Sequence, residues 1–180
     1  KTITRTIKYV DATDETTEVA RPVTQRVELT RTNKRNKVTN VVTEGTWSTG
    51  TWGSQTSPTV TNYDAPDKAT VAEATVTSTT DDTTVVVKYP QATEDVTETK
   101  TITRTIKYVD ATDETTEVAR PVTQRVELTR TNKRNKVTNV VTEGTWSTGT
   151  WGSQTSPTVT NYDAPDKATV AEATVTSTTD

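Results

Sequence analysis

Hydrophobic and polar residues alternate along the opening stretch TITRTIKYV, residues 2–10. Ile3, Ile7 and Tyr9 occupy odd positions, and Thr or Lys occupies every even position from 2 to 8. Because the side chains of a β-strand point to opposite faces with a period of two, this spacing predicts a half-buried strand. The acidic and Thr-rich residues 11–18 then interrupt the alternation, which predicts a turn.

A second alternating stretch extends over residues 19–32. Val23, Val27 and Leu29 share one face of it. Pro22 lacks a backbone N–H and cannot donate to a central ladder, so it indicates an edge strand or the start of a strand.

The segment NKRN, residues 33–36, separates two stretches of strand-like composition. Its two Asn residues tolerate left-handed backbone geometry, so it predicts a hairpin tip, followed by a strand over about residues 37–43. Later in the chain, TTVVVKY (83–89) has the β-branched composition of another strand.

The pattern then starts again, because residues 1–81 recur letter for letter as residues 100–180, a period of 100 − 1 = 99 residues. Solenoid and propeller repeats have periods of about 20–50 residues, so a longer period favours modules that fold by themselves. The segment 90–99 begins with Pro90 and is poor in apolar residues, which is typical of a linker. We therefore predict a β domain over residues 1–89, a linker over 90–99, and a second domain over 100–180 that lacks its closing strand. The expected fold class is mainly β, with tandem antiparallel or mixed sheet modules arranged like beads on a string.

The composition leaves a disordered chain as the alternative to this fold. Only 29% of the residues are hydrophobic, a balance that leans towards a disordered, Thr-rich stalk. The net charge is only −3, however, and the Val, Ile and Tyr residues stand at strand spacing. These two features favour a folded β protein with thin cores.

Several kinds of chemistry lack the residues that they need. The chain contains no Cys and no His, so it has no disulfides, no thiolate metal sites and no general base of the commonest type. We therefore expect no enzyme, no metal and no cofactor. No apolar run approaches the roughly 20 residues that span a bilayer. The sequence begins at Lys1 within a strand pattern and without a signal peptide, so we interpret the chain as a fragment of a longer protein. The nearly balanced charge argues against a nucleic-acid partner.

Two tryptophans lie five residues apart in TEGTWSTGTWGSQTSP, residues 43–58. On one continuous strand, Trp47 and Trp52 would face opposite sides, whereas across a turn they would meet on one face. A module this poor in large side chains favours both as core residues. As a candidate for contact with a sugar ring, Trp52 in its Gly- and Ser-rich surroundings ranks before Trp47. The copies in the second repeat are Trp151 and Trp146, in the same order.

Charged residues supply two further candidate sites, each with a plainer explanation. Arg31 and its copy Arg130 flank the predicted hairpin tip and are candidates for binding sialate or sulfate, although solvated charges are the simpler reading. The acidic residues of the 11–18 turn do not have the regular spacing of a dedicated calcium loop, so we interpret them as a solvated turn and predict no metal site.

Four segments together resemble a known family. They are TRTIKYVD (4–11), QRVELTRT (25–32), WSTGTW with SPTVTNY (47–63) and VVVKY (85–89). In this order and spacing they are similar to the B2-like mucus-binding repeat of surface adhesins in lactobacilli and related Gram-positive bacteria. At two positions where that family usually has Gly, this chain has Asn40 and Asn62. Asn is the other residue that best tolerates a positive φ, so we expect the turns to be kept.

The resemblance implies an extracellular, wall-attached protein with an elongated, β-grasp-related fold. In such a fold the first and last strands lie side by side, so residues 2–10 would pair with residues 83–89. The second copy ends before its equivalent of 83–89, and we expect residues 101–109 to have an open edge. The alternatives are that 83–89 serves the downstream domain or that a strand of another molecule fills the gap.

Two functions stay open at this stage. One is adhesion, in which each repeat binds host mucin glycans or glycoproteins weakly and identical repeats of a monomeric array multiply these contacts. The other is a ligand-free spacer that lifts a distal adhesive domain away from the cell wall. The resemblance supports the first function, and the lack of a convincing binding constellation supports the second.

Overall fold

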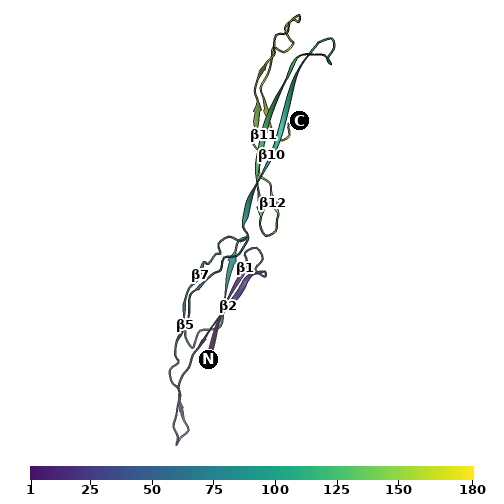
Figure 1. Ribbon diagram of the computed structural model, residues 1–180. Coiled ribbons are helices and arrows are strands. Elements are labelled where there is room, and N and C mark those ends of the chain that lie inside the picture. Colours follow the sequence, from purple (N-terminus) through teal and green to yellow (C-terminus); the bar gives the residue numbers. More distant parts are fainter. The chain divides into compact units, whose positions relative to one another are not determined.

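The computed structural model describes all residues from 1 to 180 and contains β-strands but no helix (Figure 1). The expected mainly β fold is therefore confirmed. No helix is present that could cross a membrane. The strands are β1 (Thr2–Asp11), β2 (Glu18–Glu28), β3 (Lys34–Arg35), β4 (Val42–Thr43), β5 (Gly50–Trp52), β6 (Gln55–Thr56), β7 (Thr70–Val71), β8 (Ala74–Val76), β9 (Thr83–Tyr89), β10 (Thr93–Val109), β11 (Glu117–Asn135), β12 (Val141–Thr142), β13 (Gly149–Trp151), β14 (Gln154–Thr155), β15 (Thr169–Val170) and β16 (Ala173–Val175).

The chain forms two compact units, which we describe separately. Unit 1 consists of Lys1–Thr93 together with Asn135–Asn139, and unit 2 consists of Glu94–Arg134 together with Val140–Asp180.

The main sheet of unit 1 has the strand order β2-β1-β9. β1 pairs with β2 antiparallel and with β9 parallel, in a register that runs from Arg5 opposite Thr83 to Asp11 opposite Tyr89. The expected pairing of residues 2–10 with 83–89 is thus confirmed. Ile3, Ile7 and Tyr9 are buried, as the alternation in the sequence predicts.

Pro22 lies in β2, at the edge of this sheet. The register of β1 and β2 shifts between the pairs Ile7–Val23 and Tyr9–Ala20, so Pro22 falls within an irregularity of the ladder. A residue without an N–H is tolerated at such a place. The prediction of an edge strand is confirmed.

The hairpin after β2 turns later than the sequence suggests. Lys34 and Arg35 are paired as β3 with β4, and the predicted strand over 37–43 is reduced to Val42–Thr43. Residues 36–41 form the tip instead, because the Asn36 side chain accepts hydrogen bonds from the backbone N–H groups of Val38 and Thr39. Such local bonds compete with strand pairing.

Asn40 in this tip and Asn62 further along have φ values of 57° and 68°. Their copies Asn139 and Asn161 have φ values of 60° and 70°. The expectation that Asn supplies a positive φ where the similar family has Gly is confirmed at these turns.

Unit 1 has two small hydrophobic clusters instead of one large core. The first contains Ile7, Tyr9, Val71, Val87 and Tyr89, and the second contains Ile3, Leu29, Trp52 and Val76. The pairs β5–β8 and β6–β7 cover the face of the main sheet on which these residues lie.

Unit 2 contains the sheet β10-β11-β12 and the pairs β13–β16 and β14–β15. Its hydrophobic cluster of Ile102, Leu128, Trp151 and Val175 repeats the second cluster of unit 1. The structure differs from the sequence analysis at residues 93–99, which were expected to belong to a linker. They form the first part of β10, because β11 continues to Asn135 and lies beside them.

Candidate functional site

The first surface to consider is the tryptophan segment, and it contains one buried and one half-buried ring in each copy. Trp52 ends β5 opposite Ala74 of β8 and is 4% exposed, and its copy Trp151 is 7% exposed. Trp47 and Trp146 are half-buried at the rim of the same clusters. The two rings therefore meet on one core across a turn, as one of the two geometries considered from the sequence requires.

This burial reverses the order in which the tryptophans were expected to serve as sugar contacts. A ring that is covered on both faces offers no face to a ligand, so Trp52 and Trp151 do not suit that role. Gly50 makes room for packing and does not signal exposure, whereas nothing lies within 4 Å of a Cβ built on Gly53. A Cβ built on Gly50 would lie 2.3 Å from Cγ1 of Val27.

One face of the Trp52 ring is covered by Arg5, a buried charge that the sequence analysis did not single out. The Arg5 guanidinium carbon lies 5.4 Å from the ring centroid. Its nitrogens donate to Gln25 Oε1 at 2.8 Å and to the carbonyl oxygens of Ala72 and Gly53 at 2.8 and 2.7 Å. These bonds satisfy a buried cation. The sequence contained a signal for the burial of Arg5, because this residue stands at an odd position of the strand and shares a face with Ile3 and Ile7.

The second surface is formed by Arg31, Trp47 and Glu44. The Arg31 guanidinium carbon lies 4.8 Å from the centroid of the Trp47 ring, and its two terminal nitrogens donate to the Glu44 carboxylate at 2.7 and 2.6 Å. Arg130 does the same with Trp146 and Glu143, and it also donates to Glu98 at 2.8 Å.

These contacts leave little of either side chain available to a ligand. The guanidinium group of each arginine already binds a carboxylate in the bidentate geometry that the carboxylate of a sialate ligand would adopt. The arginine also covers one face of the half-buried tryptophan ring. The hydrogen bonds that Arg130 donates to Glu143 and Glu98 raise the pKa of Arg130 above its usual value. Arg31 and Arg130 therefore act as structural members of this surface in the structure.

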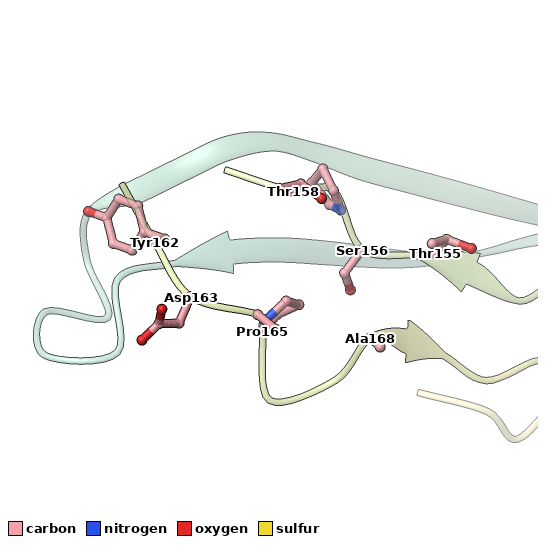
Figure 2. A pocket seen from close by; sticks show the side chains of 9 residues that line it. Thr155, Ser156, Thr158, Tyr162, Asp163, Pro165 and Ala168 are labelled. Carbon is pink, nitrogen blue, oxygen red and sulfur yellow. The ribbon is translucent and has the colours of Figure 1, made fainter. Parts of the chain in front are cut away.

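A third surface, which the sequence analysis did not consider, is a hollow that occurs in both copies. In unit 2 it has a volume of about 300 Å³ and is bounded by two segments, 155–158 and 162–168 (Figure 2). Figure 2 shows Tyr162 at one end and Thr155 at the other, with Pro165 and Ser156 between them. The equivalent hollow of unit 1 has a volume of about 330 Å³, and there Tyr89 of β9 joins the lining.

The lining combines apolar faces with free polar groups. In unit 1 the apolar part comes from Pro58, Pro66 and the Tyr63 ring. The carboxylate of Asp64 forms no hydrogen bond or ion pair, and neither does that of Asp163 in unit 2. A signal in the sequence was the dense group of Pro, Tyr and Asp in SPTVTNYDAP, residues 57–66.

The tyrosine of the hollow is held by a buried aspartate. Tyr63 OH donates to Asp11 Oδ2 at 2.9 Å, and Asp11 also accepts hydrogen bonds from Thr13 and Gln91. Burial alone would raise the pKa of Asp11, but the hydrogen bonds from Thr13, Gln91 and Tyr63 together lower it far below its usual value. Asp11 is thus an anchor of the fold, which corrects its interpretation as part of a solvated turn. No group of three or more metal-ligating side chains occurs in the structure.

Comparison with known proteins gives a consistent result for both copies. Residues 1–93 and residues 93–180 each match the family profile described as Muc B2-like domain. The solved structures include the mucin-binding domain of Spr1345 from Streptococcus pneumoniae, with 43% sequence identity over 51% of this chain and 91% of that chain and a TM-score of 0.49. The structure called Mub-RV has 21% identity, covers 97% of this chain and 91% of that chain, and gives a TM-score of 0.54, a likeness that concerns the fold alone. A search of curated protein sequences found no significant match.

Proposed function

Because this chain belongs to the Muc B2-like domain family, we propose that it is a repeat region of a bacterial surface adhesin that binds host mucin glycans. The proposal places it outside the cell and gives it a binding role with no enzymatic activity. Each repeat binds weakly, and the repeats together gain avidity. The observation that carries the proposal is that both copies present the same hollow, with the same free carboxylate.

The chemistry of the hollow suits a neutral sugar ring. The Tyr63 ring and the two prolines offer apolar surface to the C–H face of a pyranose, and the Asp64 carboxylate is free to accept hydrogen bonds from sugar hydroxyl groups. A negative charge in the hollow disfavours sialate and sulfate, because like charges repel.

Weak binding by each hollow is compatible with useful attachment. A shallow site that buries part of one sugar makes few contacts, but two linked sites on one chain convert the second binding event into an intramolecular one. Such linkage raises avidity by about 10²–10⁴-fold when both sites engage the same mucin.

The ligand-free spacer is the second candidate, and a specific observation favours it. All six residues that the sequence offered as ligand contacts are buried, half-buried or engaged within the protein, namely Trp52, Trp151, Trp47, Trp146, Arg31 and Arg130. A repeat in which these tryptophans and arginines are used internally has the character of a structural element.

Mucin and glycan-array binding by the 180-residue chain separates the two functions. We expect the wild type to bind mucin and the Asp64→Ala/Asp163→Ala variant to lose most of this binding. The matched control is Glu73→Ala/Glu172→Ala, which removes the same charge from exposed residues outside the hollow.

Each outcome has a definite meaning. A wild-type chain that binds no mucin supports the spacer. Equal loss in the two variants shows that only net charge matters, and full retention in the Asp64→Ala/Asp163→Ala variant places the site elsewhere. A single Asp64→Ala change tests avidity, since we expect it to weaken binding to a mucin surface by about tenfold or more while one hollow stays intact.

A further inference from the structure

Two segments that are distant in the sequence meet at one end of the main sheet of unit 1. β1 and β9 run parallel, and their last residues, Asp11 and Tyr89, lie opposite each other. Because the carboxyl ends of parallel strands lie at the same edge of a sheet, the residues that follow the two strands are neighbours there. Thr13 and Gln91 stand at the same distance beyond these two ends. An isolated bridge between Gln91 and Tyr63 holds the second segment in place.

The buried carboxylate of Asp11 contacts both of these side chains. Thr13 Oγ1 donates to Asp11 Oδ1 at 2.6 Å, and Gln91 Nε2 donates to Asp11 Oδ2 at 2.5 Å. Gln91 Nε2 also donates to Thr13 Oγ1 at 3.3 Å, so the hydroxyl group and the carboxamide are in direct contact. An ionised carboxylate that accepts a hydrogen bond from a hydroxyl group is placed to act as its general base.

Hydrogen bonds also fix the orientation of the Gln91 carboxamide. Its nitrogen faces Asp11 and Thr13, and its oxygen accepts a hydrogen bond from Asn135 Nδ2 at 2.7 Å. All four residues belong to unit 1. A donor at the carbonyl oxygen stabilises the negative charge that develops there when a nucleophile attacks the carbon. The four side chains thus supply a hydroxyl nucleophile, a base, an electrophilic carbonyl group and an oxyanion donor.

We propose that Thr13 and Gln91 become joined by an ester bond between their side chains, a covalent modification that cross-links unit 1. Thr13 Oγ1 attacks the Cδ carbon of Gln91 while Asp11 takes the hydroxyl proton. The C–N bond of the tetrahedral intermediate then breaks, and Asp11 passes the proton to the leaving nitrogen. The products are the ester and one molecule of ammonia, so the step consumes no oxidant and no co-reactant.

Asp11 is a weak base, and the close approach of the reacting groups compensates for this. Burial raises the pKa of Asp11, but the hydrogen bonds from Thr13, Gln91 and Tyr63 lower it far below its usual value, so the carboxyl group is ionised at neutral pH. The reaction takes place once in each molecule, and groups held in contact react as if they were highly concentrated. The Cδ carbon is bonded to the nitrogen that already contacts Thr13, so a small rotation of the Gln91 side chain presents it to the hydroxyl oxygen.

Such a bond changes how unit 1 carries tension. A force that pulls on the two ends of the chain passes from β1 through the ester to Gln91, and residues 14–90 are not stretched. A cross-link also stabilises a domain by restricting its unfolded state. The bond would serve a surface protein under shear, but it does not depend on whether the repeats bind mucin.

Intact-mass spectrometry of the whole 180-residue chain, incubated at neutral pH, tests the proposal. We expect a mass that is lower than the mass calculated from the sequence by one ammonia. A tryptic digest should contain the peptide 9–21 linked to the peptide 89–100. Alkaline hydroxylamine cleaves an ester and leaves an amide intact, so it should separate these two peptides.

Variants assign the bond to the first copy, because residues 9–21 recur letter for letter as 108–120. Thr13→Val removes the nucleophile and should restore the full mass, whereas Thr13→Ser should keep the loss of ammonia. Gln91→Met removes the carbonyl carbon without touching the turn and should also restore the full mass. The matched control is Thr16→Val, whose hydroxyl group donates to Asp14 in the same turn and which should keep the loss.

Two results overturn the proposal. One is a wild-type chain with its full mass, and the other is a loss of ammonia that persists in both Thr13→Val and Gln91→Met. Neither result bears on mucin binding, which is measured separately.

Discussion

Replacing Trp52 by Ala tests the assignment of this residue to the core. Trp52 packs with Ile3, Leu29 and Val76, and a buried Trp removes about 150–250 Å² from water. Truncation of such a side chain to Ala costs about 3–5 kcal/mol, while a unit of this size is stable by about 5–13 kcal/mol. We therefore expect Trp52→Ala to lower the melting temperature of unit 1 by at least about 12 °C.

Trp47→Ala is the matched comparison within the same segment. Trp47 is half-buried and has an exposed cation–π contact with Arg31, so its loss should cost only about 1–2 kcal/mol. Differential scanning calorimetry of the whole chain measures both variants, and Trp151→Ala should reproduce the larger effect in the transition of unit 2. If Trp52→Ala melts within about 3 °C of the wild type, or if Trp47→Ala costs as much, the division into core and rim residues is wrong.

Two further predictions concern local packing and pH. Gly50→Ala should destabilise unit 1 by about 1–3 kcal/mol, because a Cβ there would lie 2.3 Å from Val27 Cγ1 where ordinary contact begins at 3.4 Å. Gly53→Ala should change stability by less than about 0.5 kcal/mol, since nothing lies within 4 Å of its Cβ, and urea denaturation of the two variants measures the difference. Hydrogen bonds from Thr112 and Tyr162 lower the pKa of Asp110 to about 2. The pKa of an Asp in an unfolded chain is about 3.9. The stabilisation from ionised Asp110 is therefore present above that pH and lost as the pH falls towards 2. Melting temperatures between pH 5 and pH 2 should therefore fall more steeply for the wild type than for Asp110→Asn, and parallel curves would contradict this linkage.

The sequence predicts a strand correctly where the buried side chains follow from the local alternation of apolar and polar residues. In residues 2–10 every second side chain is apolar or belongs to Arg5. The pairing of this strand with β9 was expected only from the family resemblance. The turns at Asn40 and Asn62 were expected from the resemblance as well, because the similar family usually has Gly there and Asn is the other residue that adopts a positive φ most easily.

The depth of the two tryptophans could not be read from their neighbours in the sequence. Trp52 is buried because Val76 of β8 and Arg5 of β1 cover it, and both lie more than 20 residues away along the chain. Glycines and serines beside a large ring are compatible with an exposed loop or with a close approach of two segments. Only the tertiary contacts of Gly50 decide between these explanations.

The strand at residues 93–99 shows how charge can take the place of apolar patterning. Glu94 contacts Arg134, Glu98 contacts Arg130, and Asp95 contacts Lys133, so an acidic edge lies along a basic one. Pairs of opposite charge across two strands contribute about 0.2–1 kcal/mol each, and three of them act along the same ladder. The acidic character of the segment was visible in the sequence, but its basic partner lies more than 30 residues away.

Identical sequence segments adopt different secondary structure in the two copies. In the first copy, residues 31–33 are unpaired and β3 contains only Lys34 and Arg35, whereas β11 of the second copy continues without a break to Asn135. In the second copy, residues 94–99 lie beside this part of β11 and form the three ion pairs with it. The family profile also divides the chain at residue 93. We infer that the structural repeat begins there, after the closing strand β9, and that residues 94–99 belong to the sheet of the repeat that follows them.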